Sequence, residues 1–222
     1  MSRLLTVGCS FTFYKWPSWA NYLAGNFSEF LNKGIPGGDN ATIARITTSM
    51  AEPGDTVIVM WSSYQRHNYK VNFKNTYNYD TEGVHIGGSN IYNKSYFTDV
   101  YNQYERFLTT LDYLQWAITD SISRNYKLIN LSAFPFLLGE MHSEVTKDME
   151  KIIEQKKFYI NQINGKDLET FSKLYDYIDG DRHPTPIAHW NYANQVIKPL
   201  LNINNLAINE NQAIIDQENL NV

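Results

Sequence analysis

Ser10 and His183 are the residues whose types and settings best suit nucleophilic chemistry. Ser10 lies just after the apolar segment Arg3–Val7, and His183 lies in a polar loop ahead of a stretch with helical periodicity. Acyl transfer needs a nucleophilic hydroxyl, an imidazole that takes its proton and, ideally, a carboxylate that orients the imidazole. Asp181 and Asp179 are the carboxylates next to His183 in the sequence. The pattern favours a Ser-His pair, with Asp181 slightly preferred over Asp179 as a third member and a simple dyad left open.

Short apolar segments that alternate with helical patterns surround these residues. This alternation is typical of a mainly parallel sheet that is covered by helices on both faces, so the sequence predicts a three-layer α/β/α sandwich. The predicted strands are residues 3–7, 29–31, 56–61, 127–131 and a short fifth strand near 174–178. The predicted helices begin near Ser18 and span about 40–50, 101–126, 144–161 and 187–201.

The chain length bounds the domain organisation. With 222 residues and 43% hydrophobic side chains, the sequence suits one domain with a single core. We expect that domain over residues 1–201, with a Tyr- and Asn-rich loop insertion at about 67–100. Residues 202–222 form a polar tail, for which disorder is favoured over docking.

In a parallel α/β sheet, the loops at the carboxyl ends of the strands form the functional site. Those loops carry Ser10, Gly37-Gly38, Ser62 to Arg66, and Asp181 to His183. The sequence therefore predicts that polar groups from distant parts of the chain converge at one edge of the sheet.

These motifs resemble the conserved blocks of the SGNH (GDSL-like) hydrolases. Gly8-Cys9-Ser10 resembles the first block, which holds the nucleophilic serine, and Asn32 to Gly38 resembles the second, whose glycine matches Gly37. Trp61 to Tyr64 falls at the third block, and His183-Pro184 resembles the fifth, which holds the catalytic histidine. The resemblance extends from Ser10 to about Ala193. It implies a flavodoxin-like fold, an acyl-enzyme on Ser10 and an esterase activity, with O-acetylated carbohydrate as the most attractive substrate.

Two blocks depart from the family pattern. The third block normally supplies an asparagine to the oxyanion hole, whereas Ser62 and Ser63 stand there in this chain. The family aspartate usually lies three residues before the histidine, a position that Gly180 occupies here. The resemblance then implies an oxyanion hole from the N–H groups of Ser10 and Gly37, with the Ser63 hydroxyl as a third donor. Predicted substrate contacts are Arg66, for an anionic or polar group, and the rings of Trp61 and Tyr64.

Other interpretations of the same residues compete with this one. A serine after a strand is often only a turn residue, and Cys9 could serve as nucleophile, although a lone cysteine at a strand end is more often a small buried residue. The glycines at 37 and 38 could cradle a phosphate, but the sequence lacks the P-loop and dinucleotide-binding motifs. His183 and His189 could suggest a metal pair, but no third ligand is apparent.

The amino-acid composition limits the classes of molecule that the protein could bind. The formal net charge of −4 argues against nucleic acid and anionic membranes, and the apolar runs are too short for a signal peptide or a membrane span. We expect a cytoplasmic protein without cofactor or metal, acting on a small acyl ester or acylated carbohydrate. A non-catalytic binding or virion-associated protein and an acyltransferase are the alternative functions. Abundant Asn, Tyr and Ile with little Ala suggest an AT-rich genome, a phage genome among the candidates.

Overall fold

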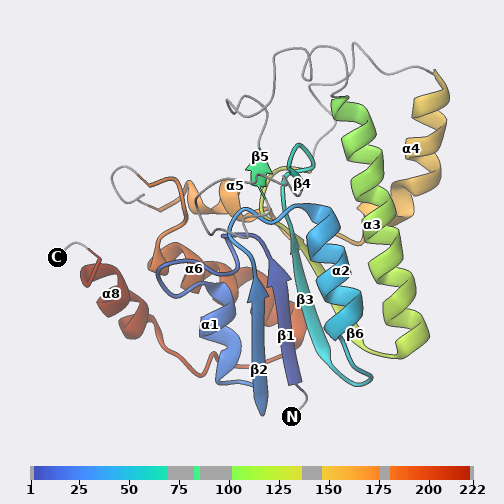
Figure 1. Ribbon diagram of the computed structural model, residues 1–222. Coiled ribbons are helices and arrows are strands. Elements are labelled where there is room, and N and C mark those ends of the chain that lie inside the picture. The colour runs from blue at the N-terminus through green and yellow to red at the C-terminus, as the bar shows by residue number, and fades with distance from the viewer. Residues whose placement is uncertain (1–2, 70–82, 86–101, 137–146, 176–180, 221–222) are drawn as a thin grey trace, which may run out of the picture.

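A parallel sheet forms the centre of the computed structural model, which describes residues 3–69, 83–85, 102–136, 147–175 and 181–220 (Figure 1). Within these ranges the sheet has the strand order β2-β1-β3-β6, and all neighbouring strands are parallel. This is the order of a flavodoxin-like sheet over its first four strands. The strands are β1 (Arg3–Gly8), β2 (Glu29–Gly34), β3 (Thr56–Trp61) and β6 (Lys127–Ser132).

The strands form where the sequence is continuously apolar and β-branched. All six residues of β3 are buried, because neighbouring strands lie on both sides of it and helices cover both of its faces. Leu4 and Leu5 of β1 are both fully buried although successive side chains point to opposite faces. The sheet therefore has a dry core on each side.

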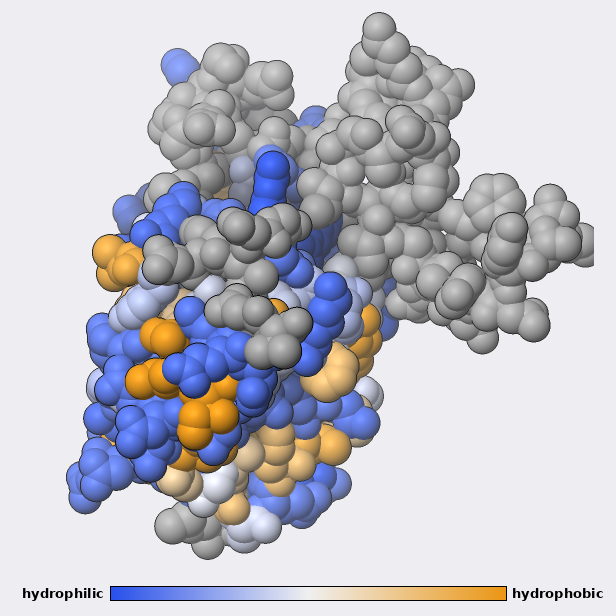
Figure 2. All heavy atoms as spheres, turned by 90° about the vertical axis from the view of Figure 1, so that its left-hand side faces the viewer, coloured by the Kyte–Doolittle hydropathy of each residue, from blue (hydrophilic) through white to orange (hydrophobic). Residues whose placement is uncertain are grey.

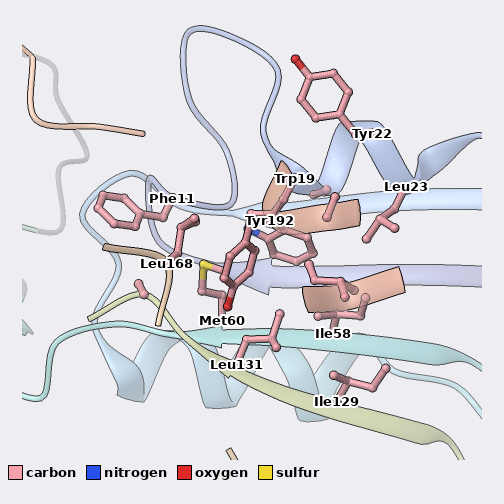
Figure 3. Packing of buried hydrophobic residues seen from close by; sticks show 14 of the residues in the cluster. Phe11, Trp19, Tyr22, Leu23, Ile58, Met60, Ile129, Leu131, Leu168 and Tyr192 are labelled. Carbon is pink, nitrogen blue, oxygen red and sulfur yellow. The ribbon is translucent and has the colours of Figure 1, made fainter. Parts of the chain in front are cut away.

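Helices cover both faces of the sheet, as Figure 1 shows. On one face α1 (Trp19–Ala24), α5 (Leu168–Ser172) and α6 (Pro186–Tyr192) contribute to a cluster that includes Phe11, Met60 and Leu131 (Figure 3). On the other face α2 (Asn40–Met50) and α3 (Gln103–Arg124) pack on the opposite side chains of β1 and β3. The predicted three-layer α/β/α architecture is confirmed.

The remaining elements extend these layers. They are α4 (Lys147–Ile160), which packs on α3, the π-helical turn η2 (Ala193–Ile197), α7 (Lys198–Leu201), α8 (Glu210–Glu218) and an antiparallel pair, β4 (His67–Tyr69) with β5 (Gly83–His85). The predicted insertion at 67–100 lies largely outside the described residues. Its described parts, β4 and β5, lie beyond the carboxyl ends of the strands (Figure 1).

The prediction of five strands is wrong for the described part of the chain, where the sheet has four. Leu174 and Tyr175, the described start of the predicted fifth strand, form turns whose N–H groups bond to Phe171 and Ser172. Residues 176–178 lie outside the described residues. Beside β6, the described chain makes a single parallel bridge between Asn130 and Ile163. A short apolar run predicted a strand here, but the local turns after α5 use its backbone groups instead.

The C-terminal segment is ordered, contrary to the favoured expectation of disorder. Ala213 of α8 is fully buried, and Tyr22 of α1 donates a hydrogen bond to Asp216 at 3.0 Å. The Trp190 indole N–H also donates to the carbonyl of Ile208 at 3.0 Å. Figure 2 looks onto this side of the molecule and shows hydrophobic residues interspersed among hydrophilic ones. Ala213 of α8 and the partly buried Ile203, Leu206 and Ile208 ahead of it dock a segment whose composition alone looked unstructured.

No helix in the described part of the chain combines the length and the apolar composition that crossing a bilayer requires.

Candidate active site

Ser10, His183 and Asp181 form a continuous series of hydrogen bonds at the carboxyl ends of the strands. The Oγ atom of Ser10 lies 2.8 Å from Nε2 of His183, and Nδ1 of His183 lies 2.7 Å from Oδ1 of Asp181. An ionised carboxylate only accepts hydrogen bonds. Nδ1 of His183 therefore carries a hydrogen atom and is the donor in the hydrogen bond to Asp181. Nε2 is then left as the acceptor for the Ser10 hydroxyl. The structure thus brings together three residues that the sequence predicted to converge.

The loop that presents Ser10 is tight because of Gly8. A Cβ atom on Gly8 would lie 2.1 Å from Oγ1 of Thr12 and 2.9 Å from the carbonyl of Met60, so a larger residue does not fit there. The carbonyl of Cys9 then accepts hydrogen bonds from the N–H groups of Thr12 and Phe13, which turns the chain sharply. Ser10 lies inside this turn and is only 5% exposed.

Residues on both sides fix the loop that presents His183. The Oδ1 atom of Asp181 accepts a hydrogen bond from the His183 backbone N–H at 3.0 Å, in addition to the one from the ring. Thr185 caps the N-terminus of α6, and Pro186 lies at its first position, a combination that sets where the helix begins. The indole N–H of Trp16, from the Ser10 side, donates to the carbonyl of Pro184 at 2.9 Å. The two loops are therefore tied together by direct bonds.

Tyr14 is a site residue that the sequence reasoning missed. Its ring stacks on His183 with the centroids 3.8 Å apart and an interplanar angle of 16°. Its hydroxyl donates to Oδ2 of Asp181 at 2.7 Å, so one side chain contacts both partners. The position of Tyr14, four residues after Ser10, was the available signal. Its contacts depend on how two distant loops meet, which local patterns do not reveal.

The protonation states of this cluster follow from its hydrogen bonds. Burial opposes the ionisation of Asp181, but hydrogen bonds from Tyr14 and His183 outweigh it and lower the pKa of Asp181. Burial, together with the bond to Asp181, raises the pKa of Tyr14 to about 12. Near neutral pH the carboxylate is therefore charged and the phenol is protonated, so that each holds its role as acceptor or donor.

Gly37 lies in a turn that is attached to the Ser10 strand. The N–H of Ile35 donates to the carbonyl of Gly8 at 2.8 Å, and the N–H of Gly38 donates back to Ile35 at 2.8 Å. Gly37 has a φ of 78°, a left-handed conformation that glycine adopts without strain. Within the described residues, neither the Gly37 N–H nor the Ser10 N–H donates a hydrogen bond. Both groups thus remain open as donors to a ligand.

An asparagine lies at the end of β3, but its amide is already engaged. Asn40 of α2 accepts from the N–H of Ser62 at 2.8 Å and donates to the carbonyl of Ser62 and to Oγ1 of Thr110. These bonds fix the backbone at Ser62, whose own hydroxyl is buried without a partner in the described residues. Ser63 is partly exposed, and its Oγ accepts a bond from Gln65 at 3.3 Å. Of the two serines, Ser63 is therefore the partly exposed one.

The prediction that the Trp61 ring contacts the substrate is wrong. Trp61 is fully buried in the core on the α2 and α3 side, and its indole N–H donates to Oδ1 of Asn130 at 3.0 Å. Its ring therefore offers no surface to a substrate. Tyr64 is partly exposed and makes an edge-to-face contact with Phe107 at 5.4 Å. Arg66 is 8% exposed, with its guanidinium over the ring of Phe134.

The structure also bears on the other roles considered for Cys9 and His189. Cys9 is fully buried in the hydrophobic core, and it is Ser10 that contacts His183. His189 is also fully buried, and desolvation lowers its pKa to about 3, so it stays neutral. Among the described residues, no cluster of His, Cys, Asp and Glu is suited to a metal ion. Asp179 lies outside the described residues.

Comparisons with known proteins give structural matches only. No family model matches the sequence, and no curated protein matches it. One similar solved structure is described as a lipolytic protein of the G-D-S-L family from Desulfitobacterium hafniense, with 14% identity, a TM-score of 0.46, and coverage of 87% of this chain and 97% of that one.

Two further structures come from Bacteroides species and are described as a GDSL-like lipase and an acylhydrolase. The lipase, from Bacteroides thetaiotaomicron, shows 12% identity and a TM-score of 0.47 over 90% of this chain and 88% of that one. The acylhydrolase, from Bacteroides fragilis, shows 14% identity and a TM-score of 0.47 over 90% of this chain and 86% of that one. The roles proposed below rest on the geometry of the site.

Proposed function

We propose that this protein is a serine hydrolase that cleaves carboxylic esters through an acyl-enzyme on Ser10. The observation that carries this proposal is the series of hydrogen bonds from Ser10 through His183 to Asp181. A nucleophile bonded to an imidazole, which is in turn bonded to a carboxylate, is the arrangement that activates a serine hydroxyl. A turn serine with a structural role only would have no need of it.

The chemistry follows from the positions of the atoms. Nε2 of His183 removes the Ser10 proton as Oγ attacks the carbonyl carbon, and Asp181 stabilises the imidazolium that forms. The imidazolium then gives its proton to the leaving alkoxide, which departs as the alcohol and leaves an acyl group on Oγ. Water, deprotonated by the same imidazole, attacks the acyl carbon and releases the acid and Ser10.

The negative charge on the carbonyl oxygen needs donors during both steps. We assign this role to the N–H groups of Ser10 and Gly37, neither of which is engaged within the described residues. The Ser63 hydroxyl is the third donor in the proposal, in the place where the resembled family has an asparagine. Since a serine hydroxyl is shorter than an asparagine amide, this donor supports a slower reaction or a substrate that lies closer to β3.

The experiment compares the hydrolysis of 4-nitrophenyl acetate by the wild type with that by Ser10→Ala and His183→Ala. We expect each substitution to lower kcat/KM by about 1000-fold or more. Ser49→Ala, an exposed serine on α2, is the matched control and should retain full activity. Equal rates for all four proteins would contradict the proposal and favour a non-catalytic binding protein.

Product analysis separates hydrolysis from acyl transfer. With a sugar present as acceptor, a hydrolase releases the free acid, whereas an acyltransferase produces an acylated sugar. Panels of O-acetylated saccharides test the predicted carbohydrate substrate in the same way, by release of acetate.

A further inference from the structure

Arg66 lies close to the candidate active site although it is not part of the hydrogen-bonded series. It follows β3, and its guanidinium carbon lies 5.2 Å from the ring centroid of Phe134. Phe134 packs on Phe11 at 5.0 Å, and Phe11 makes an edge-on contact with His183 at 5.6 Å. Phe11, the residue after Ser10, is labelled in Figure 3. Two aromatic rings thus connect the guanidinium to the imidazole.

The Arg66 guanidinium is buried, and none of the described carboxylates pairs with it. Arg66 is 8% exposed, and its Nε and Nη1 atoms have no hydrogen-bond partner within the described residues. No salt bridge of the described chain includes it. An arginine stays charged at all ordinary pH values, and a buried charge without a partner is costly. The contact with the Phe134 ring offsets only part of that cost.

A second arginine fixes the backbone of Arg66. Arg106 of α3 donates from Nη2 to the carbonyl of Arg66 at 2.9 Å, and its buried Nε also has no partner within the described residues. Arg106 therefore holds the backbone of Arg66 in place. A guanidinium whose N–H donors lack partners among the described residues attracts anionic oxygen strongly.

We propose that Arg66 binds an anionic oxygen group of the substrate, so that the site takes esters bearing a carboxylate or a phosphate. This inference rests on the proposed function and specifies its substrate class. The planar guanidinium matches two oxygens of either group. The rings of Phe134 and Phe11 lie in contact between the guanidinium and His183. The bound anion offsets the cost of the buried charge, which makes its binding favourable.

Kinetics with paired esters tests the inference. One pair is 4-acetoxy-3-nitrobenzoate and its neutral carboxamide, which differ in the alcohol part. The other pair is 4-nitrophenyl hydrogen adipate and the neutral 4-nitrophenyl hexanoate, which differ in the acyl part. We expect the wild type to prefer the anionic member of one pair by about 30-fold or more in kcat/KM, and Arg66→Gln to abolish that preference.

Variants of other arginines serve as controls. Arg182→Gln, next to His183 but exposed, and Arg45→Gln, exposed on α2, should keep the preference. Arg66→Lys retains the charge without the planar fork and should keep only part of the preference, which guards against a failure of Arg66→Gln to fold. A preference that survives in Arg66→Gln but is lost in Arg182→Gln would overturn the inference.

Thermal unfolding gives a measurement that is independent of activity. Benzoate or inorganic phosphate should raise the Tm of the wild type but not that of Arg66→Gln, and the more effective of the two identifies the anion. Hydrolysis of all four esters without anionic preference, and with no rise in Tm, would overturn this inference and leave the esterase intact. A rise in Tm that depends on Arg66, without hydrolysis of any ester, would support the anion site and overturn the esterase.

Discussion

Replacing Tyr14 by phenylalanine tests whether the Asp181–His183 pair needs the third side chain that contacts both. The substitution keeps the ring that stacks on His183 at 3.8 Å and removes the hydroxyl that donates to Asp181 at 2.7 Å. A hydrogen bond to a charged group is worth about 1.5–3 kcal/mol, and the Asp181 side chain is only 17% exposed, so little of it is lost to solvent. The transition state depends on the charge and orientation of Asp181. We therefore expect Tyr14→Phe to lower kcat by about 10- to 100-fold.

The pH dependence distinguishes this role from a purely structural one. Loss of the phenol donor raises the pKa of Asp181, because the charged carboxylate loses a bond that favoured it. The acid limb of the pH–rate profile therefore moves to higher pH. A group with a lowered folded pKa stabilises the protein above its unfolded pKa and loses that contribution as pH falls through the folded value. The unfolding free energies of Tyr14→Phe and wild type should therefore differ at pH 7 and converge below about pH 4.

Tyr126→Phe is the matched control for this prediction. Tyr126 donates to Oδ2 of Asp120 at 2.9 Å, which is a similar bond at the amino end of β6, away from Ser10. That variant should lose stability but keep its kcat and pH profile. If Tyr14→Phe has the kcat and the acid limb of the wild type, or if Tyr126→Phe changes both as much, the reasoning about Tyr14 is refuted.

Three further predictions concern other parts of the molecule. Burial lowers the pKa of His189 to about 3, so the unfolding free energy should drop by about 1.4 kcal/mol per pH unit between pH 6.5 and 3. Urea unfolding at pH 7 and pH 5 should show wild type losing about 2 kcal/mol more than His189→Leu, and equal losses would contradict the buried neutral histidine. Ser63→Ala should lower kcat by about 100-fold in steady-state assays while Ser62→Ala leaves it unchanged, and the reverse order would remove Ser63 from the oxyanion hole. Tyr22→Phe removes the bond to Asp216 of α8 and should reduce the unfolding free energy by about 1–3 kcal/mol with activity retained, whereas unchanged stability would show that this contact does not hold α8.

The layered fold could be predicted from the sequence because its strongest signals are local. The run Thr56 to Trp61 is apolar at every position, which marks a central strand wherever it occurs. Leu174, Tyr175 and the C-terminal tail were harder to predict, because short or weakly apolar segments acquire structure only from what they pack against. Ala213 is fully buried in α8, which packs on α6 and whose Asp216 accepts a hydrogen bond from Tyr22 of α1.

The candidate site was predictable where a residue lies beside a well-marked element, and it was not predictable where contacts arise from two distant loops. Ser10 and His183 stood out because each lies at a loop after or before a well-marked element, and the structure places them 2.8 Å apart. Tyr14 is one of 16 tyrosines, so its type carried no signal. Trp61 was wrongly predicted to contact the substrate because it is the last residue of a strand. At that position the direction of the side chain determines whether it enters the core or faces the site, and the sequence does not reveal that direction.

Covalent labelling with a fluorophosphonate tests the central claim most directly, because only an activated serine should react. We expect one adduct per chain on the wild type, located by peptide mass spectrometry at Ser10, and a labelling rate in His183→Ala that is lower by about 100-fold or more. No adduct, an adduct on another residue, or the same labelling rate in His183→Ala would contradict it.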